Sequence, residues 1–176
     1  MSLPFYTIGH STRTIEEFTG MLRETGIALV ADVRSVPYSR TNPQYNRDVL
    51  PGALEPYQIG YEHIAALGGL RGKSPDISPD VNAFWDNASF RNYADYAMGE
   101  DFRAGLEHLR ALGHGRCCAV MCAEALWWKC HRRIVADYLL TAGERVIHLM
   151  APGKEQPARM TPTARLTDSG RLVYSP

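Results

Sequence analysis

The sequence lacks the features that mark several large classes of protein. Its 19 lysines and arginines are balanced by 19 aspartates and glutamates, so the formal net charge is zero. That balance excludes a protein that coats nucleic acid or an anionic membrane through bulk charge. No stretch approaches the ~18 uninterrupted apolar residues of a membrane-spanning helix, and no basic segment followed by a long apolar run opens the chain. We therefore expect neither membrane association nor a signal peptide.

Cysteine is scarce as well, and it is gathered in one place. The four cysteines stand at positions 117, 118, 122 and 130, whereas a secreted disulfide framework spreads its cysteines to tie distant segments together. We therefore expect free thiols and a cytoplasmic location. With 176 residues the chain is long enough for one domain whose core needs no covalent crosslink.

Strand and helix patterns alternate along most of the chain. Four short apolar runs predict strands, at residues 5–9, 27–33, 117–122 and 145–150. Helical spacing of apolar residues predicts four helices. The first is expected to open with a capping box of Thr14 and Glu17 and to stop at Gly26, the next two to be capped by Ser89 and Asp101, and the last to begin at Cys130. Strand, helix and strand in succession form a right-handed βαβ unit. The sequence thus predicts an α/β fold: a single domain with a mostly parallel sheet and helices on both faces, in a Rossmann-like three-layer arrangement.

Other segments are irregular. Prolines interrupt residues 35–60, which leave room for no more than a short helix at 44–50, and residues 67–79 have the composition of a loop. We assign the α/β domain to residues 1–150. Residues 151–176, with prolines and scattered charges, are expected to form a C-terminal extension that packs on the domain or trails from it.

Polar side chains follow three of the predicted strands, at the point where each strand ends. In an open α/β sheet the ligand crevice lies outside the carboxyl ends of the strands, beside helix N-termini. We therefore expect three loops to bring their side chains to one edge of the sheet. The candidates, in chain order, are His10, Ser11, Asp32, Arg34, Ser39, Arg40, Cys122, Glu124, Cys130, His131 and Arg132.

The last of these loops carries the residue types of a thiol enzyme. A cysteine in the first turn of a helix, beside cationic groups, has its thiolate favoured. In this interpretation Cys130 or Cys122 is the nucleophile, His131 and His10 are acid/base candidates, and Glu124 is a carboxylate partner. The alternative is that either cysteine simply packs in the core. The spacing disfavours a metal site, because Cys130 and His131 are neighbours whose side chains diverge by about 100° on a helix.

Arginines in the same loops indicate a site for an anion. Arg34, Arg40 and Arg132, together with helix N-termini, suit an oxyanion such as phosphate. Asp32 shares one strand face with Arg34, so Asp32 either forms a buried ion pair or contacts the substrate. Ser11 either caps the next helix or joins Ser39 in binding the ligand.

Four motifs carry a family resemblance: TIGHST near the N-terminus, DVR-x2-P-x-SR at residues 32–40, LGG at 67–69 and MCAE-x5-CHR at 121–132. They resemble the bacterial and archaeal domain-of-unknown-function 488 family over residues 5 to 150. The resemblance implies a compact cytoplasmic α/β domain and no particular activity. It places all the candidates above, together with Pro37, at the family's motif positions.

The sequence supports an enzyme that acts on a phosphate-bearing small molecule or on a nucleotide or nucleic-acid component. The alternatives are a non-catalytic module that binds an anion or nucleotide or has a regulatory role, and a Cys/His metal or redox site. No cofactor is identified, because the glycines at 68, 69 and 72 lack the Walker and dinucleotide-binding spacings.

Overall fold

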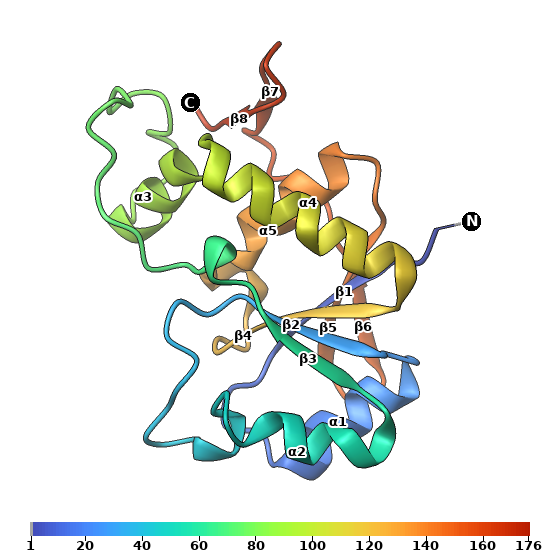
Figure 1. The fold of residues 1–176 in the computed structure, drawn as a ribbon. Helices are drawn as coiled ribbons and strands as arrows, with labels where there is room; N and C mark the ends of the chain where they lie inside the picture. The colour runs from blue at the N-terminus through green and yellow to red at the C-terminus, as the bar shows by residue number, and fades with distance from the viewer. Residues whose placement is uncertain (1) are drawn as a thin grey trace.

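The computed structural model describes residues 2–176, which are built around a six-stranded sheet (Figure 1). The strands follow the order β3-β2-β4-β1-β5-β6, the first five parallel and β6 antiparallel to β5. The strand bounds are Phe5–Gly9 for β1, Leu29–Asp32 for β2, Gly60–His63 for β3, Cys118–Cys122 for β4, Val146–Ala151 for β5 and Lys154–Pro157 for β6. The predicted α/β fold with a mostly parallel sheet is confirmed.

Helices cover both faces of the sheet, as predicted. Helices α1 (Ile15–Glu24) and α2 (Leu50–Leu54) lie on one face in Figure 1. The other face carries α3 (Ala88–Tyr96), α4 (Glu100–Gly115) and α5 (Arg132–Thr141). No helix within residues 2–176 combines the length and the apolar character that a membrane crossing requires.

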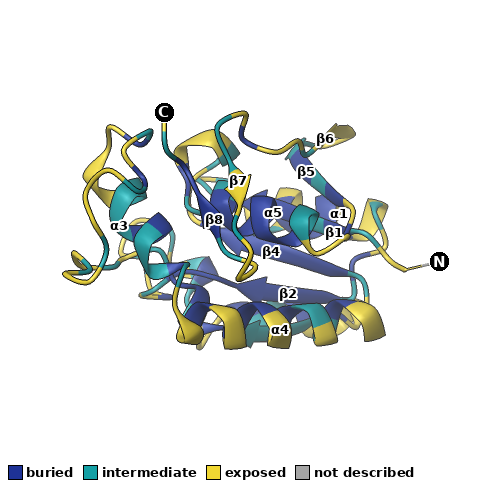
Figure 2. Cartoon of the chain, turned by 90° about the horizontal axis from the view of Figure 1, so that it is seen from above, coloured by how far each residue is buried: buried dark blue, intermediate teal, exposed yellow. Residues whose placement is uncertain are grey.

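The side chains of the inner strands alternate between two hydrophobic clusters. In β4, Cys118, Val120 and Cys122 pack with the helices α3 to α5, while Ala119 and Met121 pack with α1 and α2. Every residue of β2 and β4 is buried, which Figure 2 shows as dark blue strands beneath helices with exposed outer faces. This two-sided burial explains why these strands read as continuous apolar runs.

The helix termini confirm part of the capping predictions. Thr14 caps α1, because its hydroxyl accepts a hydrogen bond from the backbone N–H of Glu17 at 3.1 Å. The carboxylate of Glu17 does not complete a capping box; it pairs with Arg13 at 3.1 Å. Gly26, with φ of 72°, ends this helical segment as expected.

Two predicted caps were wrong. Helix α3 is capped by Asn87 rather than Ser89, because the Asn87 amide oxygen accepts from the N–H groups of Ser89 and Phe90 at 2.7 and 3.3 Å. Helix α4 begins after Gly99, so Asp101 lies in its first turn. There the negative charge still favours the helix dipole without capping a backbone N–H.

The irregular middle of the chain contains elements that the sequence did not reveal. Strand β3 adds a parallel edge to β2, with Leu29 opposite Gly60, yet all four of its residues are only half-buried and give no apolar run. The short helix α2 begins at Leu50, where the prediction ended, and only a single 3-10 turn occupies Pro43–Tyr45.

The segment after residue 150 is joined to the rest of the chain. Strand β6 extends the sheet, and β7 (Arg165–Leu166) pairs with β8 (Leu172–Val173) in a small hairpin. Tyr174 is buried, and its hydroxyl donates to the Asp137 carboxylate of α5 at 2.9 Å. The same carboxylate accepts from the backbone N–H of Thr161 at 3.0 Å. One buried acidic side chain therefore connects two points of the extension to α5.

This connection predicts a stability effect. Tyr174→Phe leaves the buried Asp137 carboxyl with one donor fewer, so we expect the free energy of unfolding to fall by about 1–3 kcal/mol. Urea denaturation at pH 7 measures the change, and Tyr57→Phe, at an exposed tyrosine, is the matched control with an expected change within about 0.5 kcal/mol. Equal effects of the two substitutions would contradict the assignment.

Candidate functional site

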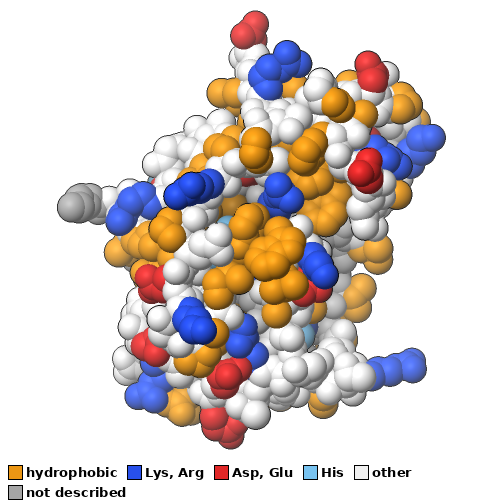
Figure 3. All heavy atoms as spheres, turned by 180° about the vertical axis from the view of Figure 1, so that it is seen from behind, with side chains coloured by type: hydrophobic (Ala, Val, Ile, Leu, Met, Phe, Trp, Pro, Cys, Tyr) orange, Lys and Arg blue, Asp and Glu red, His pale blue; other side chains and the backbone are white. Residues whose placement is uncertain are grey.

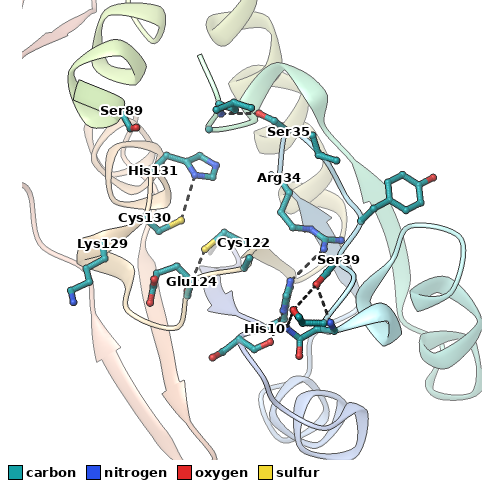
Figure 4. Close-up of a pocket in the computed structure, with 18 of the residues that line it drawn as sticks. His10, Arg34, Ser35, Ser39, Ser89, Cys122, Glu124, Lys129, Cys130 and His131 are labelled. Carbon is teal, nitrogen blue, oxygen red and sulfur yellow. Dashed lines mark hydrogen bonds between the residues drawn. The ribbon is translucent and has the colours of Figure 1, made fainter. Parts of the chain in front are cut away.

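A cleft of about 810 Å³ lies at the carboxyl ends of β1, β2 and β4 (Figure 4). The three loops expected to meet do meet there, joined by the loop around Gly69 and the N-terminus of α3. Eight of the predicted site residues line the cleft: His10, Ser11, Arg34, Ser39, Cys122, Glu124, Cys130 and His131. The parallel topology explains this convergence, since all three loops leave the same edge of the sheet.

Three predicted residues lie outside the cleft lining. Asp32 is fully buried beneath Arg34, and Arg40 is an exposed side chain beyond the cleft. Arg132 is 0 % exposed and lies behind the loop that carries Cys122 and Cys130. Their placement limits direct contact between a ligand and the predicted arginine cluster to Arg34.

Cys130 and His131 form a thiol–imidazole pair. The Cys130 Sγ lies 3.4 Å from His131 Nδ1, and His131 Nε2 lies 2.7 Å from the carbonyl oxygen of Val33. Because a carbonyl can only accept, Nε2 carries the proton and Nδ1 is free to accept one from the thiol. Burial, aided by the charge of Arg132, lowers the pKa of His131, which keeps the ring neutral at neutral pH.

The surroundings of Cys130 favour its thiolate. Burial alone raises the pKa of the Cys130 thiol, but the neighbouring Cys122 thiol and the charge and backbone N–H of Arg132 together lower it below its ordinary value. The backbone N–H of Arg132, in the first turn of α5, points to Cys130 Sγ at 3.5 Å. By contrast, burial raises the pKa of the Cys122 thiol well above its ordinary value.

Glu124 takes a different place from the one expected for a carboxylate partner of the histidine. Its Oε1 accepts from the backbone N–H of Leu126 at 3.1 Å, and the Val33 carbonyl is the group that orients His131. Its own main-chain carbonyl accepts from the guanidinium of Arg132 at 2.9 Å. Glu124 therefore shapes the loop, and its carboxylate lies at the exposed side of the cleft.

Arg132 holds this loop to the central strand. Its Nη1 donates to Thr7 Oγ1 at 2.8 Å, and its Nη2 donates to the carbonyls of Glu124 and Ala125, each at 2.9 Å. Thr7 in turn shares a hydrogen bond of 2.6 Å with Nδ1 of His148, whose ring stacks on Trp127 at 4.6 Å. The guanidinium therefore supports the wall of the cleft from behind.

Asp32 and Arg34 form the buried ion pair that was one of the two expectations for them. Asp32 Oδ1 accepts from Arg34 Nε at 2.9 Å, and Oδ2 accepts from Nη2 at 2.7 Å and from the Tyr61 hydroxyl. Arg34 also donates to the Tyr45 carbonyl at 2.6 Å and to His10 Nε2 at 3.3 Å. Of the five N–H groups of a guanidinium, this leaves one on Nη1 for a ligand.

His10 is fixed as a neutral ring. Its Nδ1 donates to the carbonyl of Ser11 at 2.9 Å while Nε2 accepts from Arg34, and the ring stacks on Tyr45 at 4.3 Å. Burial lowers the pKa of His10. With both nitrogens engaged, His10 orients Arg34 toward the cleft, and it has no free nitrogen with which to take a proton.

Two glycines allow backbone and ring to approach closely. A Cβ at Gly9 would lie 1.8 Å from the carbonyl oxygen of Glu124, and one at Gly69 would lie 2.4 Å from His131 Nδ1. At the end of β1 the positive φ falls on Ser11, at 47°, and not on Gly9. A side chain at position 9 would clash with the backbone of the loop that crosses it, and a side chain at position 69 would clash with the ring of His131. Glycine is therefore needed at both positions.

Several residues of the cleft were not among the candidates predicted from the sequence. Lys129, directly before Cys130, and Ser35 line it, and so do Asn87 and Phe90 at the N-terminus of α3. The position of Lys129 next to the CHR motif was the available signal. Nothing near α3 in the sequence connects it to the other loops. Within residues 2–176, no group of three or more histidine, cysteine, aspartate or glutamate side chains is arranged to hold a metal ion.

Comparison with known proteins identifies the family. Residues 14–139 match the model described as "Domain of unknown function DUF488", so the chain belongs to that family and the resemblance noted from its motifs is confirmed. No curated protein and no solved structure matches the chain.

The buried histidine behind the cleft predicts a pH dependence of stability. Burial lowers the pKa of His148 to about 3, whereas it is about 6.5 in an unfolded chain. The unfolded state therefore binds the proton first, and stability falls as the pH drops from 6.5 toward 3. Urea denaturation at pH 7.5 and pH 5 should show a loss that is smaller in His148→Gln by about 2 kcal/mol. An equal loss in both proteins would contradict this.

The close approach at Gly69 predicts a local steric effect. Gly69→Ala places a methyl group against His131, so we expect it to lower the free energy of unfolding by about 1–3 kcal/mol. Gly72→Ala is the matched control in the same loop, because a Cβ at Gly72 meets nothing within 4 Å. Urea denaturation of both variants measures the difference, and similar stabilities would show that the loop yields without displacing the ring.

Proposed function

We propose that this protein is an enzyme that acts on a phosphate-bearing small molecule or on a nucleotide or nucleic-acid component, with Cys130 as its nucleophile. The observation that carries the proposal is the Cys130 thiol, which lines the cleft beside an unprotonated imidazole nitrogen at 3.4 Å. Mere binding of an anion requires no such pair. A thiol with an adjacent base and a stabilised thiolate is the arrangement of nucleophilic catalysis.

In the first step one group near Cys130 accepts the proton of the thiol and another stabilises the thiolate that remains. The proton of the thiol passes to Nδ1 of His131, and Arg132 stabilises the thiolate through its charge and its backbone N–H. The thiolate then forms a bond to the electrophilic atom of the substrate while the bond from that atom to the leaving group breaks. Water afterwards cleaves the covalent intermediate, which releases the second product and returns the thiolate.

The cleft favours a small anion. The N-termini of α3 and α5 face it, and Lys129 and the last N–H of Arg34 lie in its lining. Glu124 is the only carboxylate among the lining residues. The ion pair with Asp32 offsets the charge of Arg34, so the positive charge is modest. On the face shown in Figure 3, basic and acidic side chains are intermixed and form no continuous basic band that would suit a long polyanion.

The mouth of the cleft suits an organic part of the substrate. Val36, Tyr38 and Leu70 line it and are 61 %, 54 % and 77 % exposed. Exposed apolar and aromatic side chains beside a polar floor can cover a flat, weakly polar group such as a base or ring. This supports a phosphate ester or nucleotide over bare inorganic phosphate.

Alkylation tests the nucleophile directly. We expect iodoacetamide to modify Cys130 faster than Cys117, by about tenfold for each unit by which its pKa is lowered. The rate should stay high below the ordinary cysteine pKa of about 8.5 and should fall in His131→Gln. Trypsin separates the two thiols into peptides 117–129 and 130–132, because cleavage follows Arg116, Lys129 and Arg132. Mass spectrometry then measures each rate.

Charge and competition test the ligand class. Relative to iodoacetamide, the anionic iodoacetate should gain at Cys130, and Lys129→Ala should reduce that gain without slowing iodoacetamide. In this variant trypsin leaves peptide 117–132 uncut, so fragmentation of that peptide assigns the label to residue 117 or 130. Millimolar inorganic phosphate should protect Cys130 and leave Cys117 unaffected. If Cys130 reacts no faster than Cys117, nucleophilic catalysis is wrong. Protection by phosphate without a fast thiol would indicate the non-catalytic binding module instead.

A further inference from the structure

We infer that Cys122 and Cys130 form a dithiol–disulfide couple in which Cys130 attacks a low-molecular-weight disulfide and Cys122 resolves the product. Cys122 ends β4 and Cys130 directly precedes α5, and both thiols line the cleft. Figure 4 shows the two sulfur atoms turned toward one another across the cleft wall. The inference shares with the proposed function only the nucleophilic character of Cys130.

The two thiols differ in the way such a couple requires. Cys130 is the one whose thiolate is favoured, by the charge and backbone N–H of Arg132 and by the neighbouring Cys122 thiol. Cys122 keeps its proton, because burial raises its pKa, and its Sγ lies 3.4 Å from the carbonyl of Glu124. An external disulfide is therefore expected to react with Cys130, which is also the more exposed of the two, at 7 % against 2 %.

The other two cysteines are placed too far away to take part. Cys118 shares the sheet face of Cys122 but stands four residues earlier in β4, which is about 13 Å along an extended strand. Cys117 precedes it at the opposite end of the strand from the cleft. Only Cys122 is in position to pair with Cys130.

The exchange balances in two steps. The Cys130 thiolate attacks one sulfur of the small disulfide, so a mixed disulfide forms and one small thiolate leaves. Cys122 then loses its proton to that thiolate and attacks the Cys130 sulfur, which forms the Cys122–Cys130 disulfide and releases the second small thiolate. The protein is oxidised by two electrons and the small disulfide is reduced to two thiols. An excess of small thiol reverses both steps.

Such a couple would give the cleft a reversible resting form. While the disulfide is present, Cys130 has no thiolate to offer a substrate. The bond also removes the sulfur from further oxidation to the sulfinic acid, which is irreversible for most proteins.

Oxidised glutathione is the probe for the test. The reduced full-length protein is incubated with it, quenched in acid, blocked with iodoacetamide and digested with trypsin without reductant. Because Lys129 separates the two thiols, the expected product is peptide 117–129 linked to peptide 130–132. Fragmentation of the linked peptide assigns the bond to residue 122, and a Cys117→Ser background removes one competing thiol.

Removal of the resolving thiol supplies the control. In Cys122→Ala, and in the more conservative Cys122→Ser, glutathione should remain attached to Cys130. Persistent glutathione on Cys130 of the wild-type protein, with no crosslink, would overturn the inference while leaving the nucleophile intact. A Cys130 that is slow toward iodoacetamide in the wild type would instead refute the proposed function. The two failures are therefore distinguished by one set of digests.

Discussion

A buried guanidinium is the constraint on which the rest of the site depends. Arg132 is 0 % exposed, and within the described residues its guanidinium donates to a threonine hydroxyl and to two main-chain carbonyls. None of those oxygens carries a full negative charge, and an isolated buried cation is costly. Within the described residues its Nε has no hydrogen-bond partner. In the proposed mechanism a thiolate at Cys130 would supply that negative charge, because the charge and the backbone N–H of Arg132 lower the pKa of this thiol.

The second charged group of the site is compensated in the ordinary way. Arg34 is held on both sides, by the Asp32 carboxylate and by the ring of His10, and its charge is largely neutralised before any ligand arrives. The two arginines of the site therefore differ. The charge of Arg34 is paired with the Asp32 carboxylate, whereas the charge of Arg132 lowers the pKa of the Cys130 thiol. The arginines expected to act alike have different surroundings, and those surroundings decide what each can do.

Much of this arrangement could be predicted from the sequence, because it follows from topology. Buried apolar runs identified four of the five parallel strands, and parallel strands bring their carboxyl ends to one edge. The identity of the loops at the cleft followed from that rule alone. The pattern around Cys130 also indicated a thiol at a helix N-terminus.

The rest depended on contacts between residues distant in the sequence. The guanidinium of Arg132 in α5 is oriented by a hydrogen bond to Thr7 in β1. The ring of His131 is covered by Gly69, which lies in an irregular loop. Strand β3 forms at the edge without an apolar pattern of its own. Local propensity contains no information on any of these three features.

The enclosure of His131 has a consequence for the reaction proposed for this cleft. The ring is held by the Val33 carbonyl, by the edge of Tyr93 at 4.9 Å and by the close passage of Gly69. These contacts hold the ring in one orientation, in which Nε2 donates to the Val33 carbonyl and Nδ1, beside the thiol, is the nitrogen that can accept a proton. In the proposed reaction, an in-line substitution places the departing group opposite the sulfur and away from that nitrogen. The departing group would then take its proton from water at the open mouth of the cleft.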